Sequence, residues 1–167
     1  MKIRSNSRLV MVTLALVFTL AAVKAEAASL SITLSTSSIT FPDQDPDIFP
    51  LTQQNGAALS ITITAIGNYG GPTYSCSAQA LGDLDSGLST IPIYNVKWTA
   101  VTAKGDTGES FSNGTLSKSN SVLVATGVGQ DNTSSPLQGD LTFFIDNLWT
   151  YAAGNYSQTV NFTVSTP

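Results

Sequence analysis

The sequence predicts an all-β domain, an antiparallel β-sandwich of about seven to nine strands with an immunoglobulin-like arrangement. First, apolar and polar residues alternate with a period of two through most of the chain after residue 27, as in strands with one buried face. Second, Ser and Thr supply most of the polar positions, and these uncharged residues suit a pleated surface. Third, clusters of turn-forming residues separate the alternating runs at the spacing that is typical of sandwiches.

The first element in chain order is predicted to be an export signal over residues 1–27. Three basic residues in the first eight positions precede Leu9 to Val23, an uncharged stretch that is short for a membrane span but suits a signal peptide. The tripeptide Ala25-Glu26-Ala27 then has the small residues of a cleavage site. We therefore expect residues 28–167 to form one secreted or cell-surface sandwich domain, with no membrane insertion after cleavage.

Six runs of alternating residues are the predicted strands of this domain. In each run the apolar residues share one face, so Trp98 and Phe143 are predicted to be buried in the core. The apolar positions are Leu30, Ile32 and Leu34; Leu59, Ile61, Ile63 and Ala65; Tyr74, Cys76, Ala78 and Ala80; Tyr94, Val96, Trp98 and Ala100; Leu141, Phe143 and Ile145; and Val160, Phe162 and Val164. The predicted turns between the runs are 68–72, 82–87, 104–108, 113–114, 127–139 and 153–155.

Cys76 is the only cysteine of the chain, so an intramolecular disulfide is excluded. Its place on the apolar face of a predicted strand indicates a small buried hydrophobe. The alternative is an exposed thiol that forms a bridge between two chains in an oxidising compartment.

The charge balance excludes two classes of partner. The predicted signal holds four of the seven basic residues and one of the eleven acidic residues, which leaves three basic and ten acidic residues and a formal net charge of −7. Nucleic-acid phosphates need clustered positive charge, and anionic membrane surfaces repel an acidic protein. We therefore expect neither nucleic acid nor a membrane surface among the partners of residues 28–167.

A segment rich in aspartate and proline, residues 41–50, is the candidate metal site. Asp43, Asp45 and Asp47 are spaced like the opening of a calcium loop, in which several oxygens converge on one cation. The pattern then fails, because Ile48 occupies the position of the turn glycine. Three prolines instead favour an extended crossover between two strands with solvated aspartates. We therefore predict no metal and no cofactor.

Catalytic constellations are scarce in this composition. The chain has no histidine, which excludes Ser-His-Asp and Cys-His catalysis and the usual zinc sites. Asp83 and Asp85 could act as an acid and base pair in a cleft, but their glycine-flanked setting is typical of turns that are closed by side-chain to backbone bonds. Lys118 and Ser119, the other candidate pair, are adjacent in sequence and predicted to be exposed. We expect no catalytic residues and no enzyme.

Three aromatic residues near the last predicted turn are the candidate ligand-binding residues. Trp149, Tyr151 and Tyr156 surround residues 153–155, where they could form a platform on which sugar rings stack. The alternative is that Trp149 and Tyr156 cap the open end of the sandwich and fix the last hairpin.

A set of short motifs is spread over nearly all of residues 28–167. The motifs are Ile39–Asp43, Asp45–Asp47, Gly82–Leu84, Ile91–Ile93, Val96–Thr99, Trp149–Tyr151, Gly154–Tyr156 and Phe162–Pro167. Together they resemble a group of exported bacterial β-sandwich proteins of mostly unknown function. The end of the chain is also similar to the end of the WxL-type cell-surface domain, a module that associates with the cell wall, although the tripeptides that begin at Trp98 and Trp149 lack the leucine of that domain. The resemblance implies an exported sandwich of the cell-surface type.

Two function classes follow from these observations. The leading class is a non-enzymatic structural or interaction protein that binds other surface proteins or itself, as a subunit of an extracellular assembly. Residues 28–35 alternate and carry no charge, so by default they pair with their own sheet, and the alternative is that they pair with the open edge of a neighbouring molecule. The alternative stays open because this segment lacks the Lys or Pro that protects the sheet edges of monomeric proteins. The second class is a small module that binds polysaccharide through the aromatic platform. An unpaired sheet edge would favour the first class, and a coplanar exposed aromatic pair the second.

Overall fold

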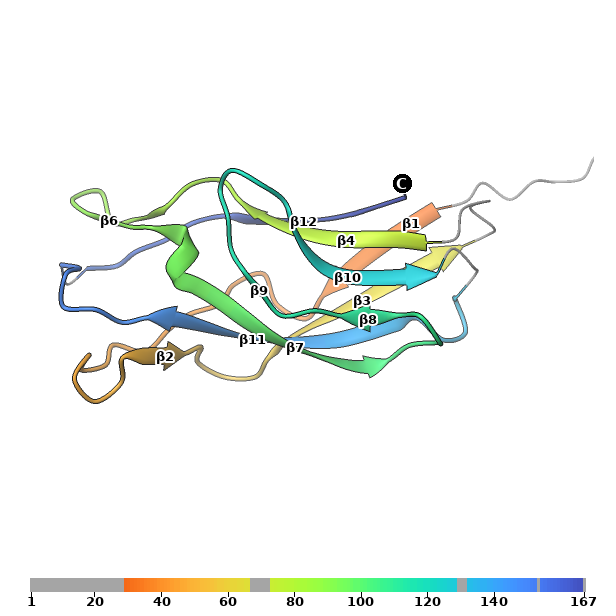
Figure 1. Cartoon of the computed structure of the whole chain (residues 1–167), viewed down its shortest axis with the longest axis horizontal. Helices are drawn as coiled ribbons and strands as arrows, with labels where there is room; N and C mark the ends of the chain where they lie inside the picture. Colours follow the sequence, from red (N-terminus) through yellow and green to blue (C-terminus); the bar gives the residue numbers. More distant parts are fainter. Residues whose placement is uncertain (1–28, 67–72, 129–131, 153, 167) are drawn as a thin grey trace, which may run out of the picture.

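The computed structural model describes residues 29–66, 73–128, 132–152 and 154–166, which form two antiparallel sheets packed face to face (Figure 1). The predicted antiparallel all-β sandwich is therefore confirmed, whereas its immunoglobulin-like classification stays a prediction. The predicted signal over residues 1–27 and the predicted turn at 68–72 lie outside the described residues. No helix within the described part of the chain is both long and apolar enough to span a bilayer.

Within the described residues, the larger sheet contains six strands and the smaller sheet four. The order of the larger sheet is β1-β3-β11-β7-β9, and β2 pairs with the end of β11 that β3 leaves free. The order of the smaller sheet is β12-β4-β10-β8, and a separate ladder joins β5 to β6. The bounds are β1 (Ser29–Leu34), β2 (Leu51–Gln53), β3 (Leu59–Ile66), β4 (Thr73–Ala80), β5 (Leu84–Asp85), β6 (Thr90–Ile91), the 3-10 helix η1 (Ile93–Asn95), β7 (Val96–Lys104), β8 (Ser110–Phe111), β9 (Gly114–Thr115), β10 (Val122–Val128), β11 (Leu137–Asp146) and β12 (Val160–Ser165).

Each of the six predicted runs contributes a long strand, namely β1, β3, β4, β7, β11 and β12. The prediction is wrong at Tyr94, which lies in η1 with its side chain 66% exposed. A turn precedes β7, because the N–H of Asn95 donates to the Pro92 carbonyl (3.0 Å). The alternation therefore begins at Val96 and not two residues earlier.

β10 has no counterpart among the predicted strands. Its ladder with β4 shifts register between Leu123 and Ala125, which is a β-bulge. Val124 and Ala125 are consequently both buried, and the period-two pattern by which strands are recognised is interrupted. With β10 included, the described residues form seven strands of six or more residues.

Two glycines lie inside strands because aromatic rings occupy the space that a side chain would take. A Cβ atom at Gly127 in β10 would lie 1.9 Å from the ring of Tyr74. A Cβ atom at Gly139 in β11 would lie 2.3 Å from the ring of Phe111. The predicted turn at 127–139 is therefore wrong at both ends, where the glycines permit close ring packing and do not reverse the chain.

The core between the sheets contains Trp98 and Phe143, as predicted. Their side chains are 2% and 5% exposed, and the ring centroids lie 6.0 Å apart. The Trp98 indole covers Gly114 in β9, and its Nε1–H donates to the Ser112 carbonyl (2.8 Å). Cys76 is fully buried on β4, and burial raises the pKa of its thiol to about 12. The prediction that Cys76 is a small buried hydrophobe is confirmed.

Candidate functional site

The first and last strands, β1 and β12, lie next to each other on one side of the sandwich (Figure 1). β1 is the outermost strand of the larger sheet, and β12 is the outermost strand of the smaller sheet. Within the described residues, β1 has a ladder with β3 alone and β12 has a ladder with β4 alone. This side, which we call the open side, therefore presents two sheet edges of six residues each.

Alternate residues of both strands direct their backbone groups away from the sheets. The N–H of Ser35 donates to the Ser60 carbonyl (2.9 Å), so the odd-numbered residues of β1 are those that bond to β3. The N–H of Leu81 donates to the Thr159 carbonyl (3.0 Å), so the odd-numbered residues of β12 are those that bond to β4. The backbone N–H and C=O groups of the even-numbered residues therefore face the open side. These residues are Leu30, Ile32, Leu34, Val160, Phe162 and Val164.

The same six residues carry apolar side chains that are only partly buried against the core. The next strands inward bury their apolar residues almost completely, with Ile61 of β3 and Cys76 of β4 both 0% exposed. Neither β1 nor β12 contains a charged residue. The open side thus combines unused backbone groups with an incompletely covered apolar surface.

The opposite side of the sandwich has features that hinder strand addition over part of its length. Its outer strands, β8 and β9, contain two residues each. Next to β9, the N–H of Ala100 in β7 donates to Asn113 Oδ1 (2.7 Å), so a side chain takes the place of a neighbouring strand. A register shift between Gln138 and Gly139 adds a bulge to the ladder of β11 with β7. Short strands, bulges and side-chain caps are means by which sheet edges are blocked.

The candidate acid pair, Asp83 and Asp85, is bound into loop structure. Asp85 Oδ1 accepts a bond from the backbone N–H two residues later (2.7 Å), which closes the predicted turn. Asp83 accepts a bond from Lys118 (2.5 Å) and another from the backbone N–H of Ile93 (3.1 Å), and these bonds hold its pKa below the usual range. Lys118 thus pairs with Asp83 and not with the adjacent serine. The three charged residues of the candidate catalytic pairs, Asp83, Asp85 and Lys118, therefore all bond to other groups of the protein.

The three aspartates of the candidate calcium segment are exposed. Asp45 Oδ1 accepts a bond from the N–H of Asp47 (3.0 Å), and the Asp45 carbonyl accepts bonds from the N–H groups of Ile48 (3.1 Å) and Phe49 (2.8 Å). The predicted extended crossover is therefore wrong at residues 46–48, which form a turn. In the part of the chain that is described, Asp43, Asp45 and Asp47 are not among any group of side chains placed to hold a metal ion.

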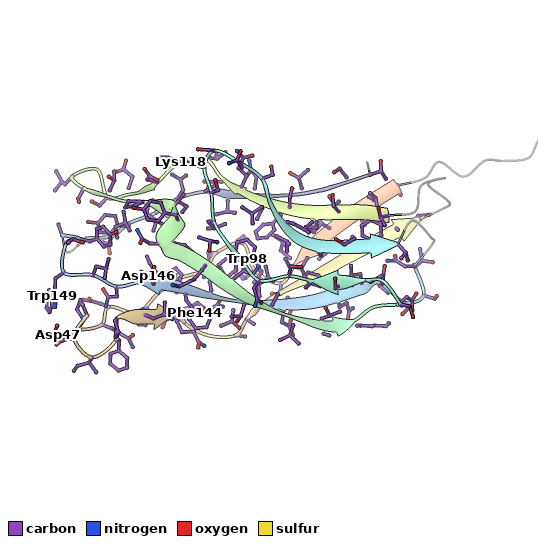
Figure 2. The ribbon with its side chains drawn as sticks, in the orientation of Figure 1. Asp47, Trp98, Lys118, Phe144, Asp146 and Trp149 are labelled. Atoms are coloured by element: carbon purple, nitrogen blue, oxygen red, sulfur yellow. The ribbon has the colours of Figure 1, made fainter. Side chains whose placement is uncertain are left out.

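The three aromatic candidates bond to different partners. Trp149 lies at the end of the sandwich farthest from the start of β1 (Figure 2). Trp149 is 69% exposed, and its Nε1–H donates to Asp47 Oδ1 (2.9 Å). The Tyr151 hydroxyl accepts a bond from Asn95 Nδ2 (2.8 Å), and the Tyr156 hydroxyl donates to a carbonyl of its own loop (2.8 Å). Both tyrosines are half-buried. Among the described residues, no ring pair joins any two of the three aromatic side chains.

Trp149 lies where two loops with exposed apolar residues meet, which the sequence pattern does not reveal. Ile48 is 67% exposed, Phe49 45% and Leu148 44%, on the two loops that meet at Trp149. Asn147 Nδ2 joins these loops by donating to the carbonyls of Gln44 (2.8 Å) and Phe49 (3.2 Å). Isolated apolar residues in loops carry no periodic signal, so only the structure brings them together.

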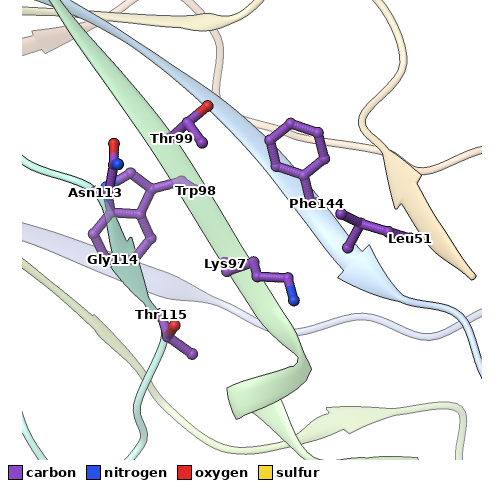
Figure 3. Close-up of a pocket in the computed structure, with 8 residues that line it drawn as sticks. All are labelled: Leu51, Lys97, Trp98, Thr99, Asn113, Gly114, Thr115 and Phe144. Carbon is purple, nitrogen blue, oxygen red and sulfur yellow. The ribbon is translucent and has the colours of Figure 1, made fainter.

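A shallow groove of about 450 Å³ lies on the outer face of the larger sheet, between β2 and β9 (Figure 3). Leu51 and Phe144 form its apolar wall, and Lys97 on its floor pairs with Asp146 (2.7 Å). The residues that line it are Leu51, Lys97, Trp98, Thr99, Asn113, Gly114, Thr115 and Phe144. This set contains no carboxylate or thiol that could act as a general acid, base or nucleophile.

A buried polar cluster closes the end of the sandwich near the start of β1. Tyr74 donates its hydroxyl proton to Glu109 Oε1 (3.2 Å) and accepts a bond from Asn132 Nδ2 (3.2 Å). Burial, followed by the charge of Glu109, raises the pKa of Tyr74 well above its usual range. Asn132 Oδ1 in turn accepts a bond from the N–H of Ala65 (2.6 Å). The cluster therefore ties together elements of both sheets and fixes the Tyr74 ring.

Comparisons of the chain with protein-family models, with curated proteins and with solved structures found no match.

Proposed function

We propose that the processed chain is a non-enzymatic structural or interaction protein of the cell surface, and that it joins an extracellular assembly through the edges of its β-sheets. The open side carries this proposal. Two uncharged edges with free backbone groups can accept a strand from another molecule, because ladder hydrogen bonds form between chains as they do within one chain. Monomeric proteins usually block such edges, and on the opposite side of this chain Asn113 caps the N–H of Ala100.

The roles of the titratable groups support a function without catalysis. The chain has no histidine, and its cysteine is buried. Asp83 and Asp85 accept hydrogen bonds from backbone N–H groups of loops, and Lys118 forms an ion pair with Asp83. The resemblance to exported β-sandwich proteins and the predicted signal over residues 1–27 support a location outside the cell. Other surface proteins or further copies of this chain are the proposed partners.

Carbohydrate binding is the second candidate function, and the exposure of Trp149 favours it. An exposed indole whose orientation is held by Asp47 offers a flat face on which a sugar ring can stack. The other two aromatic candidates give less support, because their hydroxyl groups bond within the protein and their rings are half-buried.

The oligomeric state of the protein on its native surface and its binding of polysaccharide distinguish the two proposed functions. We expect protein released from the native surface without denaturant to have, in light scattering at a concentration of about 1 mM and without further dilution, the mass of two or more chains. Binding to a panel of cell-surface polysaccharides is expected to be absent, both for the native protein and for Trp149→Ala. Strictly monomeric native material that binds a polysaccharide and loses this binding in Trp149→Ala would support the second function and contradict the first.

A further inference from the structure

We infer that the open side is a two-fold interface between two copies of this chain, in which β1 pairs with β1 and β12 with β12 of the second copy. The inference rests on the proposed function and names the partner. A two-fold axis perpendicular to the sheets keeps each sheet in its own layer and reverses the direction of every strand. Each edge therefore meets its own copy in the antiparallel orientation, and both sheets continue into the second molecule.

The pattern of free backbone groups fits this symmetry. On both edges the free N–H and C=O groups belong to the even-numbered residues, and each edge is six residues long. In an antiparallel ladder, donors and acceptors of one strand face acceptors and donors of the other, so an edge of this kind is complementary to itself. The two edges lie beside each other on one side, which allows both ladders to form in a single encounter.

The side chains of the open side do not oppose the approach of a second copy. The processed chain carries a net charge of −7, so two copies repel each other over most approaches. β1 and β12 carry no charge, so pairing of these strands with those of a second copy brings no charged strand residues together. The six half-buried apolar side chains of one copy would cover the same six of the other, which removes apolar surface from water.

The expected strength follows from the size of the interface. Each edge is about 20 Å long, and the two layers lie about 10 Å apart, so the contact is smaller than a standard interface of about 800 Å² per partner. We therefore expect a dissociation constant on the order of micromolar or weaker, with rapid exchange upon dilution. At a local concentration well above this dissociation constant, such an interface would be largely occupied.

The test is sedimentation of the processed protein, expected to begin at Ala28, over concentrations from about 1 μM to about 1 mM. Ser31→Lys and Thr163→Lys each place a charge at the centre of one edge, on a side chain that is exposed in the monomer. Ser110→Lys adds the same charge to β8 on the opposite side, where the side chain is also exposed, and is the matched control. We expect a concentration-dependent dimer that both edge variants weaken about tenfold or more and that the control leaves unchanged.

Three outcomes would overturn the inference. The first is a dimer that the edge lysines and the control affect equally. The second is a dimer that persists for hours after dilution, which would indicate exchange of β1 between copies. The third is a monomer at every concentration; in that case the proposed function survives if the native surface material is assembled with other chains, and it fails as well if that material is monomeric.

Discussion

Replacement of Trp98 by alanine is expected to lower the free energy of unfolding by about 3–5 kcal/mol, the range for deletion of a large aromatic side chain from a core. The indole is 2% exposed, packs against Phe143 at a centroid distance of 6.0 Å and fills the space over Gly114. Its deletion also leaves the Ser112 carbonyl without the bond from Nε1 (2.8 Å). Denaturant unfolding of the two proteins measures the difference.

Trp149→Ala is the matched control for this variant. It removes the same side chain from a position that is 69% exposed, so we expect a change within about 0.5 kcal/mol. If Trp98→Ala were as mild as Trp149→Ala, the assignment of the buried face of β7 would be wrong. A large loss for both variants would instead show that the Trp149 side chain contributes to the core.

Gly127→Ala is expected to destabilise the protein by about 3 kcal/mol, at the upper end of the usual cost of overpacking. The added Cβ would lie 1.9 Å from the Tyr74 ring, which cannot move freely, because its hydroxyl bonds to Glu109 and Asn132. A shift of the ring would therefore also weaken buried hydrogen bonds, each worth about 0.5–1.5 kcal/mol. Thermal and denaturant unfolding provide the measurement.

The control for the second prediction is Gly154→Ala. Its Cβ would meet the nearest atoms at 3.4–3.6 Å, which is ordinary contact, so the change is expected to stay within about 0.5 kcal/mol. Equal stability of Gly127→Ala and Gly154→Ala would contradict the close packing of Tyr74 over β10.

The strands that sequence alone predicts are those with an uninterrupted period of two. Residues such as Ile61 and Trp98 alternate with polar neighbours, and this pattern reports burial on one face directly. β10 escapes the same reasoning because its bulge places Val124 and Ala125 in the core together. Gly127 misleads for a related reason, since a glycine that accommodates a ring looks the same in sequence as a glycine that turns the chain.

The sequence likewise predicts one part of the candidate site, the edge strand β1, but not the other, the edge strand β12. The lack of charge in the first strand is visible in the sequence, so β1 could be proposed as an exposed edge from residues 28–35 alone. β12 could not be proposed as an exposed edge from its sequence, because alternation does not indicate which strand of a sheet is outermost. That property depends on the strand order β12-β4-β10-β8, and the alignment of two edges on one side depends on how the sheets pack. Exposed loop residues such as Ile48 and Phe49 are also missed, because apolar residues in loops carry no periodic signal.

The most direct test of the open side is residue-resolved amide hydrogen exchange on residues 28–167, at low and at high concentration. In dilute solution we expect fast exchange at Leu30, Ile32, Leu34, Val160, Phe162 and Val164, whose N–H groups face away from the sheets. The odd-numbered neighbours, such as Thr33 and Thr163, are expected to exchange slowly, because their N–H groups bond to β3 and β4. At high concentration the six fast amides should become protected together, while Ser110 and Thr115 on the opposite side stay unchanged. Protection of the six amides already in dilute solution, or fast exchange of all six at high concentration, would contradict an edge that is free in the monomer and paired in the assembly.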